Sequence, residues 1–385
     1  MAWFHTDYLV GRPLDNNAHV TDICRIVFPS LAQYSRELHI PVNMLHASLY
    51  DLIVSSFYYE VAISNDGWTY CAENNHDSSP LITFPFVNAC PLCSTVQNKI
   101  VKCVGNKPES GSIGKITSET LLLLLKEMFH FYSKHVVVNI GQEPLDFVIS
   151  SLDDSNHCIG EIKAAPLVVL PLCSQIPALD IATTHKHRYL ADMSSLPLSI
   201  FLPIANEGSW SYRMISLGQS TSPSWAIQGL LNAIISDENF LKDYFFFWHY
   251  SFECYRDKSR HHPLYWLTNG CGSKGTTNVS DSKTSVGMDR TDDIKKGIYQ
   301  LLKIGAESRK SPPIGQHCFI SLLSNLHAIR HHEDYIQPIE NIMWRYSDIA
   351  DLTSSYYNLY DGLFSFSLQH LKNPWLSNLF DFTHE

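Results

Sequence analysis

The sequence predicts a mixed α/β fold, with a mixed central sheet flanked by helices, a helical N-terminal region and a large insertion. Three observations predict this fold. Apolar residues recur at the three- and four-residue spacing of helices in residues 20–34 and 41–59. A leucine-rich helical pattern over 115–133 leads into short β-branched strands. An amphipathic helix over 292–305 and an apolar strand over 317–323 then follow a long, irregular stretch.

The segment from 115 to 170 predicts, in order, a helix, two strands, a turn and a third strand. The leucine run from Leu121 to Leu125 implies a helix that is buried nearly all round, and Thr117 or Ser118 fits its N-cap. The polar turn carries two adjacent aspartates. The strands are expected at 135–140, 144–151 and 158–170, with the turn at 153–156.

Composition and pattern divide the chain into five segments. These are a helical N-terminal region (1–110), the first half of the α/β core (111–175), an insertion (176–290), the second half of the core (291–330) and an aromatic-rich C-terminal segment (331–385). Within the insertion we expect a strand at 198–203, a helix over 217–247 and a loop at 270–289. The rings of the last segment form either core or a dimer contact: Trp344, Tyr356, Tyr357, Tyr360, Phe364 and Phe366.

Charge and composition exclude some classes of protein. The net charge of −10 argues against coating nucleic acid by bulk attraction, although it leaves room for a specific enzyme with a local basic cleft. The apolar runs are too short to cross a bilayer, and the first residues carry no basic or long apolar leader pattern. Ten cysteines without such a leader indicate reduced thiols or metal ligands. We therefore expect a cytoplasmic protein without a membrane partner.

Asp146, Glu161 and Lys163 form the constellation that predicts chemistry. Glu161 and Lys163 are two residues apart in a strand, so they project to the same side of the sheet. If the hairpin is symmetric about the bond between Asp153 and Asp154, residues whose numbers sum to 307 face each other, and Asp146 lies opposite Glu161. Two carboxylates that close share a hard divalent cation, which predicts Mg²⁺ as the cofactor.

Phosphodiester hydrolysis requires these groups. The cation activates water and neutralises developing charge, while the ammonium group of Lys163 orients the water or stabilises charge. The alternative is an exposed polar face of a half-solvated sheet, with Asp146 as a strand-end residue. The flanking segments 147–149 and 164–170 are too apolar for a freely solvated face, which favours a functional site.

The run Pro144-Leu145-Asp146, followed after fourteen residues by Glu161-Ile162-Lys163, resembles the PD-(D/E)XK signature of restriction endonucleases and related nucleases. In that family a helix precedes the hairpin that bears the motif, and a helix and strand complete the core. The resemblance implies that Gln300, on the later helix, supports the site. It also implies an added acid from the first helix, for which Glu127 is favoured over Glu119.

A chain with this insertion and no helicase, P-loop or methyltransferase motif looks most like a type II restriction endonuclease. That resemblance implies sequence-specific, Mg²⁺-dependent hydrolysis of double-stranded DNA by a homodimer, with a cognate DNA methyltransferase encoded nearby. One alternative is a structure-selective repair or recombination nuclease. A second is a non-catalytic DNA-binding protein on a nuclease-like fold.

Cysteines of the N-terminal region predict a structural Zn²⁺ site, since the segment has no periodic pattern to order it. Cys90 and Cys93 form a CxxC knuckle, Cys103 follows, and Cys71 is a candidate for the fourth ligand, with His76 as a further possibility. The alternative is a set of ordinary thiols.

Basic and aromatic residues alternate near the end of the insertion, over residues 255–266. Cations there would contact phosphates or guanine edges, and rings would contact sugars or bases, unless the segment is a solvated turn. The expected DNA-binding residues are Arg256, Lys258, Arg260 and His261, together with Lys186 and Arg188 from a second basic cluster.

Overall fold

The chain divides into two compact units. The computed structural model describes residues 6–64, 69–71, 81–84, 93, 103–105, 110–175, 197–207, 209–257, 286–309, 315–346 and 355–382. Unit 1 consists of Met1–Asn17, Ser118–Ala165 and Val286–Glu385, and unit 2 of Ala18–Thr117 and Pro166–Ser285. Residues 118–165 and 291–330 of the predicted core belong to unit 1, as does the C-terminal segment, whereas residues 111–117 and 166–175 fall in unit 2. The N-terminal region from residue 18 onward and residues 176–285 of the predicted insertion also belong to unit 2.

Unit 1 is built around a seven-stranded mixed sheet with the order β1-β5-β6-β7-β11-β14-β15. β11 runs parallel to its neighbours β7 and β14, and the other adjacent strands are antiparallel. A separate two-stranded ribbon pairs β12 with β13. The strands are β1 (Arg12–Pro13), β5 (Val136–Ile140), β6 (Phe147–Ser151), β7 (Asn156–Ile162), β11 (His317–Leu323), β12 (Met343–Tyr346), β13 (Ser355–Asn358), β14 (Gly362–Phe364) and β15 (Gln369–Leu371).

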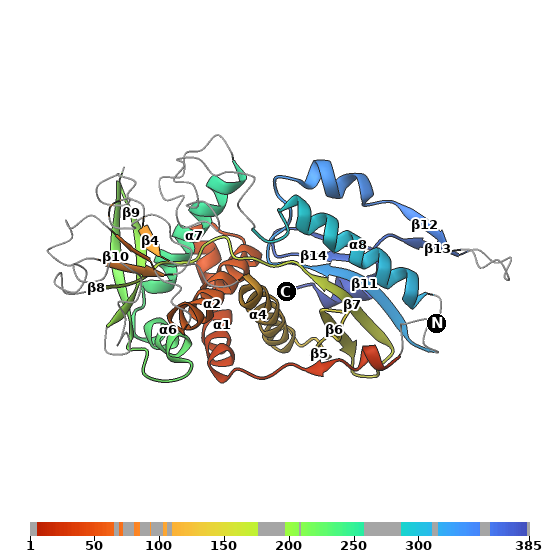
Figure 1. Ribbon diagram of the computed structural model, residues 1–385, viewed down its shortest axis with the longest axis horizontal. Helices are drawn as coiled ribbons and strands as arrows, with labels where there is room; N and C mark the ends of the chain where they lie inside the picture. Colours follow the sequence, from red (N-terminus) through yellow and green to blue (C-terminus); the bar gives the residue numbers. More distant parts are fainter. Residues whose placement is uncertain are drawn as a thin grey trace. The chain divides into compact units, whose positions relative to one another are not determined.

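Helices flank this sheet, as the sequence predicts. α8 (Thr291–Ser308) packs against β7 and β11 (Figure 1). The hydrophobic core between them includes Val148, Ile159, Ile320 and Leu322 from the sheet and Ile294, Leu301 and Ile304 from α8. The unit also contains η1 (Thr6–Leu9), most of α4 (Ser110–Phe131), η5 (His332–Ile336), η6 (Gln337–Ile339) and α9 (Pro374–Leu379). The fold is therefore mixed α/β.

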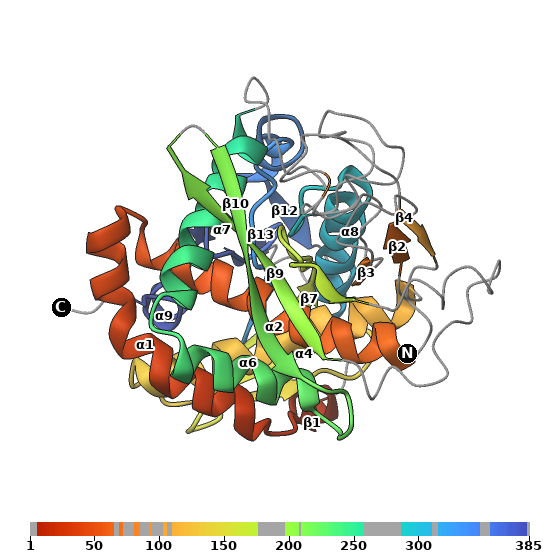
Figure 2. The same ribbon diagram turned by 90° about the vertical axis from the view of Figure 1, so that its left-hand side faces the viewer.

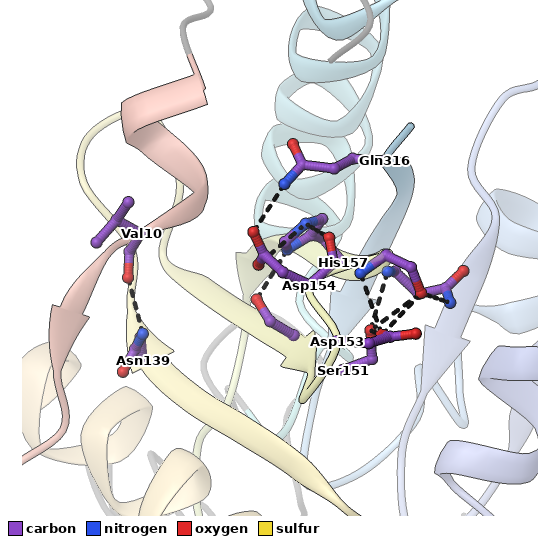
Figure 3. Close-up of polar contacts among 10 residues, drawn as sticks. Val10, Asn139, Ser151, Asp153, Asp154, His157 and Gln316 are labelled. Atoms are coloured by element: carbon purple, nitrogen blue, oxygen red, sulfur yellow. Dashed lines mark hydrogen bonds and ion pairs between the residues drawn. The ribbon is translucent and has the colours of Figure 1, made fainter. Parts of the chain in front are cut away.

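The turn between β6 and β7 is closed by a local hydrogen-bond network (Figure 3). Asp153 Oδ1 accepts from the hydroxyls of Ser151 at 2.6 Å and Ser155 at 2.8 Å, and from Ser155 N at 3.2 Å. These donors lower the pKa of Asp153 to about 2. Asp154 takes a left-handed conformation (φ 59°), and its carboxylate accepts from Gln316 Nε2 at 2.8 Å. The network fixes where the hairpin folds back.

The hairpin register agrees with the predicted one. Phe147 pairs with Gly160, Val148 with Ile159, Ile149 with Cys158 and Ser150 with His157, and each pair sums to 307. His157 is buried beside the turn, where its ring contacts Ser150 Oγ at 2.8 Å and Asp154 O at 3.1 Å. Symmetry about the bond between Asp153 and Asp154 is thus confirmed.

Gly160 is required by the close approach of β11. Its φ is 155°, and a Cβ atom there would lie 1.9 Å from the backbone oxygen of Ser321, which is far inside van der Waals contact. Ser321 is the residue that faces Gly160 in the parallel ladder. A side chain at position 160 would therefore force β7 and β11 apart.

Unit 2 combines a helical layer with a six-stranded antiparallel sheet of order β10-β9-β8-β3-β2-β4. α6 packs against β10 and α7 against β9 (Figure 2). The helices are α1 (Ala18–Leu38), α2 (Val42–Ser64), α6 (Trp225–Ser236) and α7 (Phe240–Arg256). The strands are β2 (Thr69–Cys71), β3 (Leu81–Phe84), β4 (Cys103–Gly105), β8 (Leu172–Gln175), β9 (Leu198–Asn206) and β10 (Ser209–Gly218). No helix among the described residues is long and apolar enough to cross a membrane.

A buried carboxylate in unit 2 binds the backbone of residues 167 and 168, where the second segment of that unit begins. Asp51 is fully buried in α2, and its Oδ2 accepts from the backbone N–H of Leu167 and Val168, both at 2.9 Å, and from Trp248 Nε1 at 2.6 Å. Three donors on one carboxylate oxygen offset much of the cost of burying its charge.

Several predicted elements require correction. The N-cap expected at Thr117 or Ser118 is wrong, because α4 begins at Ser110 and the Thr117 hydroxyl donates to Gly114 O within the helix. The strand expected over 158–170 ends at Ile162, before Pro166, which has no N–H to give to a ladder. The helix expected over 217–247 is instead the end of β10 followed by α6 and α7.

The aromatic C-terminal segment is largely core, as one of its two interpretations predicts. Tyr360, Phe364 and Phe366 are buried, whereas Tyr356 is 62% exposed. The rings of Trp344 and Tyr357 both lie against the guanidinium of Arg309, at 5.5 and 4.5 Å. No dimer contact is needed to explain the buried rings.

We expect Gly160→Ala to destabilise the protein by about 2–4 kcal/mol, because β11 must move to accommodate the methyl group. Chemical denaturation measures this loss. Gly114→Ala is the matched control, since that helical position has nothing within 4 Å of the added atom, and its stability should stay the same or rise. Equal stabilities of the two variants would contradict the contact.

Candidate active site

Asp146 and Glu161 continue one face of the hairpin beyond the core. Val148 and Ile159 face each other in the ladder, and both belong to the core beneath α8. Glu161 lies two residues further along β7 and projects from that same face. Asp146 directly precedes β6, and its carboxylate lies within hydrogen-bonding range of Glu161. The structure thus brings the two predicted acids together.

The ladder changes at Asp146 in a way that orients its carboxylate. Asp146 N donates to Gly160 O at 2.8 Å, one residue out of the register in which paired numbers sum to 307. Ile162 N, however, donates to Asp146 Oδ2 at 2.8 Å, while Asp146 O accepts from Gly141 N at 2.9 Å. The carbonyl of Asp146 thus accepts from the loop before β6, whereas its side chain accepts from the end of β7. Its second oxygen, Oδ1, can still act as a ligand.

Lys163 extends the same face next to Glu161. Its ammonium group pairs with Glu161 Oε1, and the two side chains are 23% and 9% exposed. Lys163 N donates to Leu323 O at 2.9 Å, which continues the pairing with β11. A Cβ at Gly297 of α8 would lie 3.6 Å from Lys163 Cγ, so the lysine stem lies along this part of the helix.

Burial and a neighbouring negative charge favour the protonated form of Glu161. Desolvation, and secondarily the adjacent charge of Asp146, raise the pKa of Glu161 to about 7, while Lys163 opposes the rise. When protonated, Glu161 is within hydrogen-bonding range of the Asp146 carboxylate. Near neutral pH the pair therefore binds a proton part of the time, and a cation would displace that proton.

The donor set fits a hard divalent cation only in part. Asp146 and Glu161 each offer a carboxylate oxygen, which is the ligand type that Mg²⁺ prefers. Within the described ranges, no group of three or more His, Cys, Asp and Glu side chains is arranged to hold a metal ion. Glu127, half-buried on α4, thus does not complete a group of three with Asp146 and Glu161. The other candidate acid, Glu119, forms an ion pair with Arg12, with 3.7 Å between Glu119 Oε1 and the guanidinium nitrogen. Solvent or substrate would have to supply the remaining ligands.

Gln300 lies on α8, one turn after Gly297. Its Oε1 is buried and accepts no hydrogen bond from the described residues. The supporting role that the resemblance implies for Gln300 stays a prediction.

The predicted zinc ligands are described only in part. Cys71 and Cys103 face each other in the pairing of β2 with β4, and Cys93 is fully buried. Cys90 lies outside the described residues. The backbone register therefore brings two of the four candidates together, and the zinc site stays a prediction.

Of the expected DNA-binding residues, the structure describes Arg256 alone. It is exposed at the end of α7, pairs with Glu253 and lies 6.0 Å from the Phe252 ring centre. The others lie outside the described residues: Lys186, Arg188, Lys258, Arg260 and His261.

Sequence reasoning missed two residues beside the site. Gly160 precedes Glu161 and admits β11, and Asn325 hydrogen-bonds to the backbone just after Lys163. A glycine inside an apolar strand is a recognisable signal of close backbone approach. Asn325 lies two residues beyond the end of an apolar strand, which is a much weaker signal.

Comparison with known proteins found no matching family model, no matching curated protein and no matching solved structure. Inference about function therefore rests on the geometry of this site and on its sequence motif.

The pKa of Glu161 predicts how stability depends on pH. The folded carboxyl keeps its proton up to about pH 7, whereas the unfolded one releases it near 4.5, so folding binds a proton between these values. In EDTA, the free energy of unfolding should therefore fall by on the order of 2 kcal/mol as pH rises through this window.

Glu161→Gln should remove this dependence, as measured by chemical denaturation at a series of pH values. Asp153→Asn is the control, because its carboxyl has a pKa lowered to about 2 and titrates below the window. A slope that persists in Glu161→Gln would show that other groups cause it.

Proposed function

We propose that this chain is a Mg²⁺-dependent DNA endonuclease of the PD-(D/E)XK class. The observation that carries the proposal is the meeting of Asp146, Glu161 and Lys163 on one face of a hairpin. Two carboxylates converge there, and the lysine two residues after the second acid pairs with it. A merely structural ion pair needs only one of these acids.

The order of the elements around the site supports the same class. α4 precedes the hairpin, Asp146 directly precedes β6, and β7 carries Glu161. α8 and β11 follow as a helix and strand that pack on β7. This is the order that the resemblance implies for the family core. The chain between Ala165 and Val286 departs from the unit and returns, as expected of an insertion.

Each residue has a chemical role in this proposal. A bound divalent cation would supply water activation and neutralise charge that develops on the phosphate. Asp146, oriented by Ile162 N, and Glu161 would hold that cation, which would take the place of the proton that burial and the neighbouring charge favour on Glu161. The ammonium group of Lys163, beside Glu161, would orient the attacking water or stabilise a phosphate oxygen.

The finer proposal is a type II restriction endonuclease that acts on double-stranded DNA as a homodimer, with a methyltransferase encoded nearby. One centre of this kind cuts one strand, so a double-strand break is most simply made by two symmetry-related centres. Exposed Arg256 and the basic residues that follow α7 are the proposed DNA contacts.

The main prediction is that the purified protein cleaves plasmid DNA with Mg²⁺ and stops when EDTA is added. Asp146→Asn, Glu161→Gln and Lys163→Ala should each lower the rate by at least about 100-fold, because each removes charge stabilisation at the scissile phosphate. Asp153→Asn removes a charge from the turn of the same hairpin but keeps the Oδ1 acceptor of the turn, so it should retain cleavage. Wild-type rates in any two of the three site variants would refute the assignment.

The finer proposal predicts cut ends that share a short palindromic sequence and a dimer in light scattering. Sequencing of the ends from a library of linear duplexes tests this. Arg256→Ala should weaken binding to that sequence by about 1–3 kcal/mol if it contacts base edges. A monomer that prefers branched over linear DNA would instead favour a repair or recombination nuclease.

A further inference from the structure

A buried asparagine holds the chain immediately after the Glu161-Ile162-Lys163 run. Asn325 is fully buried, two residues beyond the end of β11. Its Oδ1 accepts from Ala165 N at 3.0 Å, and its Nδ2 donates to Ala165 O at 2.8 Å. One side-chain amide thus satisfies both backbone groups of a single residue.

This contact prolongs the β7–β11 ladder past the end of both strands. Lys163 N donates to Leu323 O at 2.9 Å, and that is the final backbone bond from β7 to β11. Two residues further along each segment, the side-chain amide of Asn325 makes the two hydrogen bonds with Ala165 that a strand backbone would otherwise make. Ala165 O also accepts from Gly287 N at 2.9 Å, so Ala165 is held by three hydrogen bonds.

The backbone of Lys163 is therefore fixed from both directions. On the N-terminal side, Ile162 N is bound by the Asp146 carboxylate, and on the C-terminal side, Ala165 is bound by Asn325. The side chain of Lys163 is long and flexible, so the position of its ammonium group depends on the position of its backbone. A displacement of that group by about 1 Å can reduce the catalytic rate by about 100-fold.

We propose that Asn325 is a positioning residue for Lys163. The inference rests on the proposed function, because it assigns Asn325 a part in the same reaction. In this assignment Asn325 acts through Ala165, and its effect is on the rate of the chemical step rather than on the affinity for DNA or for the cation.

An asparagine suits this role because its amide presents one donor and one acceptor side by side. A protonated carboxyl offers the same pair, whereas an ionised carboxylate offers acceptors alone. The contact in Asn325→Asp should therefore depend on pH, because it forms only when the introduced carboxyl is protonated. Burial raises the pKa of the introduced carboxyl, so that it regains both hydrogen bonds as pH falls.

The experiment compares Asn325→Ala, Asn325→Asp and the control Asn373→Ala with the wild type under saturating Mg²⁺. Asn373 is a matched control, since it also binds backbone with its side chain, accepting from Trp375 N at 2.8 Å as the N-cap of α9. Asn325→Ala should lower kcat about 10- to 100-fold, with KM and the Mg²⁺ dependence changed by less than about threefold. Asn373→Ala should lower thermal stability and leave kcat unchanged.

The rate of Asn325→Asp relative to wild type should rise as pH falls from about 9 to about 6. If Asn325→Ala does not fold, this ratio decides the question, and a flat ratio overturns the inference. A normal kcat in folded Asn325→Ala also overturns it. A wild-type protein that cleaves no DNA would instead contradict the proposed function.

Amide hydrogen exchange gives a readout that needs no cleavage. The N–H of Ala165 should exchange faster in Asn325→Ala than in wild type, while that of Ile162 keeps its protection through Asp146. If the Ala165 N–H stays protected, Asn325 does not hold this segment and the inference fails at its first step.

Discussion

The antiparallel register of β6 and β7 is the constraint on which the rest of the site depends. It is set by a short turn in which Asp153 Oδ1 accepts three hydrogen bonds and Asp154 adopts a left-handed conformation. A slip of one residue would move every side chain of one strand to the other face. Asp146 and Glu161 would then project to opposite sides, so local turn chemistry determines whether the two acids can act together.

Once the acids are together, the fold must tolerate their repulsion. Unit 1 does so with three neighbours of different kinds: the N–H of Ile162 on Asp146, the ammonium of Lys163 on Glu161, and a shared proton near neutral pH. Each of these neighbours reduces the repulsion between the two carboxylates in a different way.

Much of this hairpin could be predicted from sequence because its determinants are local. Turn residues, strand alternation and the sum of residue numbers together give the correct register. The α8 helix and the β11 strand were also predicted, since their apolar patterns are regular. Contacts between distant segments gave no such signal: Asn325 with Ala165, or Asp51 with Leu167, have no periodicity or motif. The start of α4 was missed because Thr117, which looks like a cap, donates to Gly114 O within the helix. The split of α6 from α7 falls at the polar run 237–239, a local break between two apolar stretches that the sequence pattern presents as one helix.

The parallel pairing of Gly160 with Ser321 links the site to the order in which the chain is synthesised. The hairpin leaves the ribosome well before β11, because residues 166–285 are made in between. Until then the two acids have their turn but lack the parallel neighbour, the covering α8 helix and the amide of Asn325. Domains generally fold as units once their segments are available. If the proposed function holds, a nascent chain cannot cut DNA before synthesis has passed the insertion and the strand that follows it.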